Sequence, residues 1–146
     1  MSGLRELYQE VIIDHNKCPR NFCKLSGHSH YAEGLNPLCG DRISLYLDIQ
    51  QDKIERVSFE GSGCAISTAS ASLMTEMLKG KDVEEAKKLF SVFHALLTGQ
   101  EASDEGDDIG KLQVLAGVKE YPARVKCATL AWHALMDAMS GAETHG

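Results

Sequence analysis

The chain has 146 residues, and its contents of 43% hydrophobic and 25% charged residues are those of an ordinary globular protein, which argues against extensive disorder. We therefore expect a single domain over residues 1–146 with a buried core. The formal net charge is -6 and the basic residues are scattered, so no continuous basic surface for nucleic acid is expected. No hydrophobic run approaches the length that spans a membrane.

An amphipathic helix is predicted at the start of the chain, because hydrophobic residues recur there on one helical face until Pro19 ends the pattern. Hydrophobic and polar residues then alternate over 43–49 and over 57–59, with a polar turn at 50–53 between them. This pattern predicts an antiparallel hairpin. Residues 25–34 are a weaker candidate for a third strand, because their alternation is poor and they include glycines.

The second half of the chain is predicted to be helical. One helix covers residues 66–77 and ends at Gly80, and a second begins with a capping box of Asp82 and Glu85 and ends at Gly99. Residues 100–108 contain five acidic residues without hydrophobic periodicity, which predicts a solvated loop.

A short helix over residues 109–118 and a longer one beginning at Pro122 complete the prediction. Strands in the first half and helices in the second indicate an α+β fold. We expect a small antiparallel three-stranded sheet with helices packed on one face.

The cysteines are the strongest functional signal. There are five, an odd number, and residues 1–6 lack the basic flank and apolar stretch of a secretory signal, so we expect a cytoplasmic protein without a disulfide framework. Metal binding or thiol chemistry is then the natural use of these residues.

Three of the cysteines lie at the ends of predicted elements. Cys39 precedes the first strong strand, Cys64 begins a helix, and Cys127 lies in the first turns of the last helix. Together with Asp41 they would supply three thiolates and one carboxylate, which completes a tetrahedral zinc shell. The alternative is that the three cysteines are small buried hydrophobic residues, as free cysteines often are.

The sequence also places positive groups near the predicted ligands, where they would balance the negative charge of such a shell. Three thiolates, a carboxylate and a divalent cation carry a net charge of about -2. Arg124 and Lys126 flank Cys127, and helix N-termini at Cys64 and Cys127 favour the thiolate form. An oxygen ligand makes the shell less closed than four sulfurs would, so that one thiolate can be released without loss of the metal.

The chain resembles the SufU/IscU family of iron-sulfur cluster assembly proteins over nearly its whole length. The matching segments follow in family order: residues 7–15, 19–21, 36–41 (NPLCGD), 61–67 (GSGCAIS) and 124–130 (RVKCATL).

Within this family the chain is more similar to the SufU branch. A long segment over residues 97–118 precedes the last cysteine, and Lys126 stands where IscU-type scaffolds carry a histidine. The Leu-Pro-Pro-Val-Lys chaperone-binding motif of IscU is replaced by residues 121–126 (YPARVK).

The resemblance implies a zinc-dependent sulfurtransferase that takes persulfide sulfur from a SufS-type cysteine desulfurase and passes it to downstream Suf cluster-assembly proteins. It makes Cys39 the acceptor, Asp41, Cys64 and Cys127 the other zinc ligands, and Arg124 a cation that assists exchange at the metal. One alternative is a scaffold on which the same residues build a transient [2Fe-2S] cluster. Another is an interaction module in which the zinc is purely structural.

The remaining candidates have simpler readings. Cys18 and Cys23 match no family position and are expected to be incidental thiols rather than a second metal pair. We expect His28 and His30 on a solvated strand face. His94 and His133 are expected to be packing or surface residues, and the acidic loop either solubilises the protein or contributes to docking.

Overall fold

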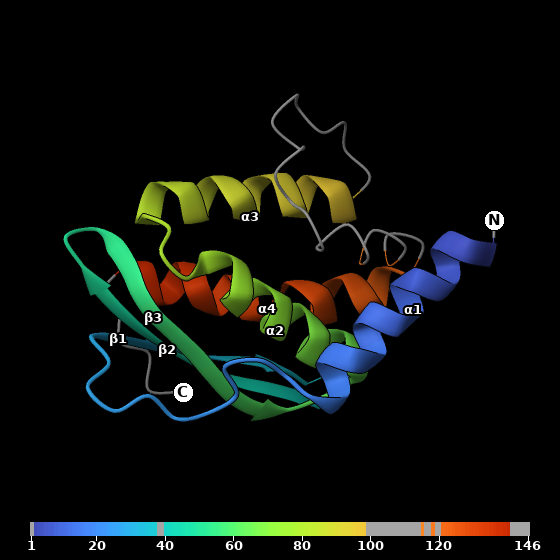
Figure 1. Cartoon of the computed structure of the whole chain (residues 1–146), viewed down its shortest axis with the longest axis horizontal. Coiled ribbons are helices and arrows are strands. Elements are labelled where there is room, and N and C mark those ends of the chain that lie inside the picture. Colours follow the sequence, from blue (N-terminus) through green and yellow to red (C-terminus); the bar gives the residue numbers. More distant parts are fainter. Residues whose placement is uncertain (1, 38–39, 99–114, 116–117, 119–120, 141–146) are drawn as a thin grey trace.

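The computed structural model describes residues 2–37, 40–98, 115, 118 and 121–140. Within these ranges it contains four helices and three strands, arranged as an α+β fold (Figure 1). In chain order they are α1 (Ser2–Lys17), β1 (His30–Asn36), β2 (Asp41–Gln50), β3 (Lys53–Ser62), α2 (Ala65–Leu78), α3 (Val83–Leu97) and α4 (Pro122–Met139).

The three strands form one antiparallel sheet in the order β1-β2-β3. The predicted hairpin is confirmed as β2 and β3, whose turn places Gln51 and Asp52 at positive φ, the conformation that tight hairpin turns require. The third strand is confirmed, but its predicted bounds were wrong. Pairing with β2 begins only at His30, opposite Leu47, and continues to Asn36.

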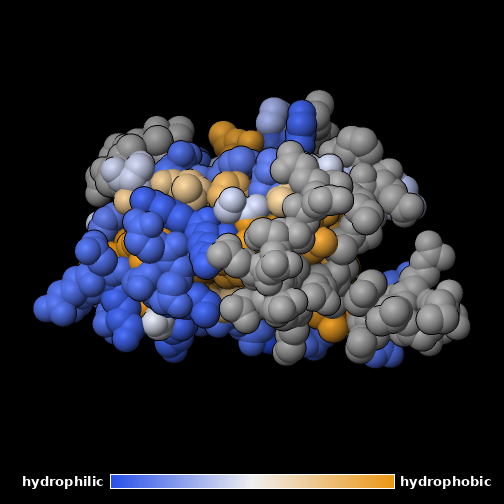
Figure 2. Space-filling view, turned by 90° about the horizontal axis from the view of Figure 1, so that it is seen from above, coloured by the Kyte–Doolittle hydropathy of each residue, from blue (hydrophilic) through white to orange (hydrophobic). Residues whose placement is uncertain are grey.

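Helices α2 and α4 pack against one face of the sheet, with α4 on β1 and β2 and α2 on β3. Helix α1 lies against α2, and α3 forms an outer layer over α4 (Figure 1). Viewed from the α3 side, the described surface is mostly hydrophilic, with smaller hydrophobic areas between the polar side chains (Figure 2). No helix among the described residues is long and apolar enough to span a bilayer.

The core lies between the sheet and the helices, and Trp132 of α4 is at its centre with no exposed surface. Its ring packs on Phe93, and its Nε1 donates a hydrogen bond to Ser70 Oγ at 3.1 Å. Ser70 in turn donates to the backbone oxygen of Ala128. This chain of contacts joins α2 to α4 and fixes the relative position of the two helices that carry candidate cysteines.

A second polar contact joins α1 to α2. The ring of His15 is 1% exposed, and its Nδ1 lies 2.7 Å from Ser72 Oγ. The same hydroxyl accepts the backbone N–H of Arg20 at 2.8 Å, and His15 Nε2 lies 3.5 Å from a carboxylate oxygen of Glu76. The chain therefore leaves α1 in a fixed direction.

The predicted helix ends are mostly confirmed. Asp82 and Glu85 form the capping box of α3, and Pro122 is the first residue of α4. The acidic segment 100–108 lies outside the described residues, as does most of the predicted helix over 109–118. Of the latter, Leu115 and Val118 are described, and both are buried.

Candidate metal centre

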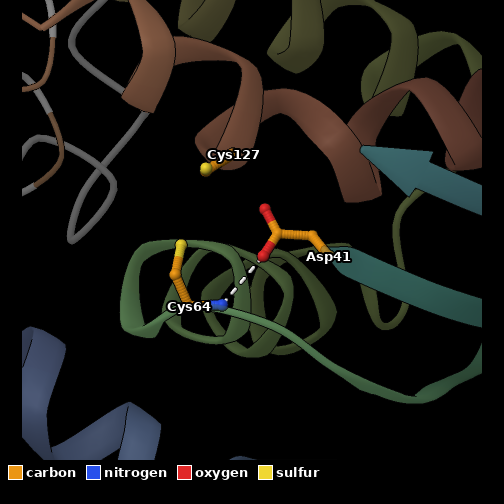
Figure 3. A group of neighbouring side chains, drawn as sticks. All are labelled: Asp41, Cys64 and Cys127. Atoms are coloured by element: carbon orange, nitrogen blue, oxygen red, sulfur yellow. Dashed lines mark hydrogen bonds between the residues drawn. The ribbon is translucent and has the colours of Figure 1, made fainter. Parts of the chain in front are cut away.

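Three of the four predicted ligands lie together, although they come from three different elements. Asp41 begins β2, Cys64 immediately precedes α2, and Cys127 lies in the first turns of α4. One ligand atom from each lies within 4.8 Å of the other two, and the side chains point toward one another (Figure 3). Among the described residues, no other set of three such side chains lies this close.

Asp41 is 2% exposed, and the protein orients its carboxylate. The backbone N–H of Cys64 donates to Oδ1 at 2.8 Å (Figure 3). The side-chain amide of Asn36, which pairs with Asp41 across β1 and β2, lies 3.5 Å from Oδ2. A buried carboxylate needs such donors, since burial without them is costly.

Cys64 is the N-cap residue of α2 and is half buried. Its Sγ accepts the backbone N–H of Ser67 at 3.4 Å. The sulfur thus caps a backbone N–H of the first turn, and the positive end of the helix dipole lies beside it. The prediction that Cys64 lies at a helix N-terminus is confirmed.

Glycines make the approach to Cys64 possible. A Cβ on Gly63 would lie 2.6 Å from Asp41 Oδ1, closer than real Cβ contacts allow. Gly61 has a φ of +152°, and a Cβ there would meet the backbone oxygen of Arg42 at 2.0 Å. The carboxylate can reach the Cys64 N–H only because position 63 has no side chain.

Cys127 is completely buried on α4. Its Sγ lies 3.7 Å from the backbone oxygen of Ala123, one helical turn earlier, and 3.7 Å from the amide nitrogen of Asn36. The thiol can therefore donate to a carbonyl, and the sulfur can accept from an amide. Asn36 contacts two candidate ligands, a role that the sequence analysis missed because Asn36 was noted only as part of a motif.

The structure does not place the other two predicted site residues, Cys39 and Arg124, among the clustered side chains. Cys39 lies outside the described residues, two positions before Asp41 in the chain. Arg124 is exposed in the first turn of α4, three residues before Cys127, and Lys126 is also exposed. The functions predicted for Cys39 and Arg124 therefore stay predictions.

The donor set and its spacing fit zinc. In a tetrahedral zinc site, ligand atoms at the usual bond lengths are about 3.5–3.8 Å apart. The separations of up to 4.8 Å found among Asp41, Cys64 and Cys127 need only a small contraction to reach that range. Two sulfurs and a carboxylate oxygen leave one position of a four-ligand shell to be filled.

The remaining candidates do not join this cluster or form another in the described part of the chain. Cys18 and Cys23 are exposed. The expectation of a solvated strand face is wrong for His28, which lies before β1, is half buried and packs on the ring of Tyr46 with centroids 5.2 Å apart.

The histidines of α3 and α4 were expected to be packing or surface residues, and this is confirmed. His94 and His133 both pack against Phe90, with ring centroids 5.8 Å and 5.3 Å from it.

Comparison with known proteins identifies the family. A sequence model described as NifU-like N terminal domain matches residues 7–128. The zinc-dependent sulfurtransferase SufU of Bacillus subtilis is 46% identical over 134 residues, which are 92% of this chain and 90% of that protein. The iron-sulfur cluster assembly scaffold protein IscU of Streptococcus pyogenes is 44% identical over 139 residues, which are 95% of this chain and 86% of that protein.

Solved structures agree with this result. The crystal structure of a putative iron-sulfur cluster assembly scaffold protein for the SUF system from Fervidobacterium islandicum superposes with a TM-score of 0.85 at 36% identity, covering 92% of this chain and 97% of that one. The chain therefore belongs to the NifU-like N-terminal domain family, the SufU and IscU family of iron-sulfur cluster assembly proteins.

Proposed function

We propose that this protein is a zinc-dependent sulfur acceptor that works with a SufS-type cysteine desulfurase and passes the sulfur to downstream Suf cluster-assembly proteins. The observation that carries this proposal is the convergence of Asp41, Cys64 and Cys127 from three elements of the fold. Cys39, two positions before Asp41, is the fourth ligand and the acceptor.

In this proposal three ligands, Asp41, Cys64 and Cys127, keep the metal bound while the fourth, Cys39, is released. Asp41 and Cys64 are joined by a hydrogen bond, and Cys127 is buried on a helix that the core holds in place. Bound zinc keeps the thiolates deprotonated and protects them from oxidation. Held there, Cys39 would be kept as a thiolate, and it would act as a nucleophile once a residue of the partner replaced it as a ligand.

The transfer itself needs no external oxidant or reductant. The Cys39 thiolate attacks the terminal sulfur of the persulfide on the desulfurase, and a new sulfur–sulfur bond forms. The bond between that sulfur and the cysteine of the desulfurase breaks, and its electron pair leaves with that cysteine as a thiolate. Cys39 ends as a persulfide that a downstream protein can accept.

Cations near the centre support this exchange. Four ligands of this kind and one divalent ion carry a net charge of about -2. Arg124 and Lys126 lie on the same helix as Cys127, within three residues of it, and both are exposed. We assign Arg124 the role of a cation that stabilises the thiolate released during exchange.

A [2Fe-2S] scaffold is the second candidate function, because soft thiolates accept either zinc or iron-sulfur chemistry. The relative at 44% identity is called a scaffold, whereas the relative at 46% is called a zinc-dependent sulfurtransferase, so identity alone does not separate them. Lys126 and the replacement of the chaperone-binding motif by residues 121–126 favour the sulfur acceptor.

The test is cysteine turnover by the SufS-type desulfurase of the same organism, with and without the zinc-loaded protein. Wild-type protein should stimulate turnover strongly, and a folded, zinc-bound Cys39→Ala variant should not. The exposed thiol Cys23 offers a matched control, and Cys23→Ala should stimulate like wild type. A wild-type protein that binds the desulfurase without stimulating it would contradict the proposal and favour the scaffold.

A further inference from the structure

A buried amide on the inner face of the sheet has a position that packing alone does not explain. In β1, Ala32, Gly34 and Asn36 share the face that is turned toward α4. Ala32 is completely buried, and Asn36, only 6% exposed, continues that face with a polar side chain. Burial of an amide is costly unless its hydrogen-bonding groups find partners.

Its partners are two of the candidate metal ligands. The side-chain nitrogen of Asn36 lies 3.5 Å from Asp41 Oδ2 and 3.7 Å from Cys127 Sγ. Both separations are at the long end of hydrogen bonding, so each contact is weak by itself. Together they form a bridge, because the same amide nitrogen contacts one candidate ligand on β2 and another on α4.

The fold fixes this bridge from both sides. Asn36 and Asp41 are paired in the β1–β2 register, which sets the distance between their backbones. Helix α4 approaches β1 closely, since a Cβ on Gly34 would lie 3.1 Å from the side chain of Leu130. Cys127 precedes Leu130 by one helical turn, so the same close approach brings its sulfur to the amide.

We propose that Asn36 is a positioning residue of the metal centre, whose amide keeps Asp41 and Cys127 together on the metal while Cys39 is displaced. This inference rests on the proposed function. Asp41 then has a donor for each oxygen, the N–H of Cys64 for Oδ1 and the amide of Asn36 for Oδ2. Donors that hold ligands typically contribute 10- to 100-fold to metal affinity.

The experiment measures zinc affinity by competition with a chromophoric chelator, in wild-type protein and in a Cys39→Ala background that reproduces the centre without its exchangeable ligand. Asn36→Leu keeps a similar volume and removes the donors, and Asn36→Ala is a second variant for the case that leucine does not fold. We expect about a 10- to 100-fold loss of affinity in the Cys39→Ala background and a smaller loss in wild type.

Thr75→Val is the matched control, because it removes a completely buried hydroxyl that accepts from Asn21 at 3.1 Å on a different part of α2. It should lower stability and leave zinc affinity unchanged. Unchanged affinity in both Asn36 variants, or an equal loss in Thr75→Val, would overturn the proposal.

A spectroscopic readout separates positioning from general stabilisation. With Co²⁺ in place of zinc, loss of the N–H contact to Cys127 should shift the thiolate-to-cobalt charge-transfer band to longer wavelength, because a thiolate without that donor holds its electrons less tightly. An unshifted band in Asn36→Leu would contradict the proposal. Neither readout involves the desulfurase, so a failure of sulfur transfer leaves the metal measurements to decide the role of Asn36.

Discussion

The inner face of the sheet changes character along strand β2. From Ile43 to Leu47 its inward side chains are hydrophobic and buried, and they pack under α2 and α4. Asp41, at the start of the same strand and on the same face, is 2% exposed but carries a carboxylate. The two ends of this face are equally buried, but one is hydrophobic and the other carries an ionisable group.

This difference separates the residues that stabilise the fold from the candidate ligands of the metal centre. Burial of the hydrophobic end lowers the free energy of the folded state directly. Burial of the Asp41 carboxylate at the other end is costly, and the hydrogen bonds from Cys64 and Asn36 offset that cost without adding hydrophobic stabilisation. We therefore expect substitutions at the hydrophobic end to change stability and those at the polar end to change metal binding.

The largest effect is expected at the hydrophobic end. Trp132→Ala should lower the free energy of unfolding by about 3–5 kcal/mol, because it leaves a cavity and removes the donor to Ser70. Urea unfolding of the metal-free and zinc-loaded proteins measures this. The loss should be similar in both forms, and Tyr121→Ala, at a 59% exposed position, should change little. A loss confined to the zinc-loaded form would contradict the separation.

The second substitution removes a charge from the polar end. Asp41→Asn should reduce zinc affinity by at least about 100-fold, since losing a ligand should cost no less than losing a residue that supports one. The metal-free variant should be about as stable as wild type, because the amide oxygen can still accept the Cys64 N–H, and removal of a buried charge offsets the loss of the Asn36 contact to Oδ2. Chelator competition and urea unfolding measure the two quantities, and a destabilised metal-free variant with wild-type affinity would contradict the comparison.

A smaller effect is expected from backbone crowding beside the ligands. Gly63→Ala places a methyl group against Asp41 Oδ1 and should reduce zinc affinity by about 10-fold, a loss of the size caused by disturbing a supporting residue. Ser62→Ala, at the exposed neighbouring position, is the control and should bind zinc like wild type. Equal zinc affinities in the two variants would show that zinc binding does not depend on the close contact between position 63 and the Asp41 carboxylate.

The smallest effect is a pH dependence at the α3–α4 contact. Burial, and secondly the neighbouring His94, lowers the pKa of His133, while Asp137 opposes this. The folded state then binds the proton less readily than the unfolded chain, so stability is full above pH of about 6.5 and declines as the pH falls below it.

Urea unfolding of the metal-free protein between pH 7 and 5 measures this decline. His133→Gln should flatten it, and Asp137→Asn, which removes the opposing charge, should steepen it. If the free energy of unfolding declined equally steeply with pH in wild type and in both variants, a group other than His133 would be responsible.

The sequence was sufficient to predict most of the fold, because its signals are local. The capping box of Asp82 and Glu85 and the first-turn proline Pro122 are each determined by neighbouring residues, and both were confirmed. The start of β1 was missed because it depends on pairing with β2, where His30 meets Leu47, rather than on alternation within the strand.

The clustering of three candidate ligands was predictable from the sequence, but the contacts that support them were not. Spacing and family resemblance pointed to Asp41, Cys64 and Cys127, and the structure brings them together. No local pattern marks the contacts of Asn36, since its partner atoms lie 5 and 91 residues away along the chain. Contacts of that kind depend on strand register and on the close approach of α4 to β1, which appear only in three dimensions.

The most direct test of the central claim is a titration of the metal-free protein with Co²⁺, followed by the thiolate-to-cobalt charge-transfer band. We predict saturation at about one Co²⁺ per chain, displacement by an equal amount of zinc, and an intensity that falls by roughly a third in Cys39→Ala, because one of the three thiolates is lost. A Cys127→Ala variant that keeps the full band, or a band lost on replacing Cys18 and Cys23 instead, would contradict the proposed centre.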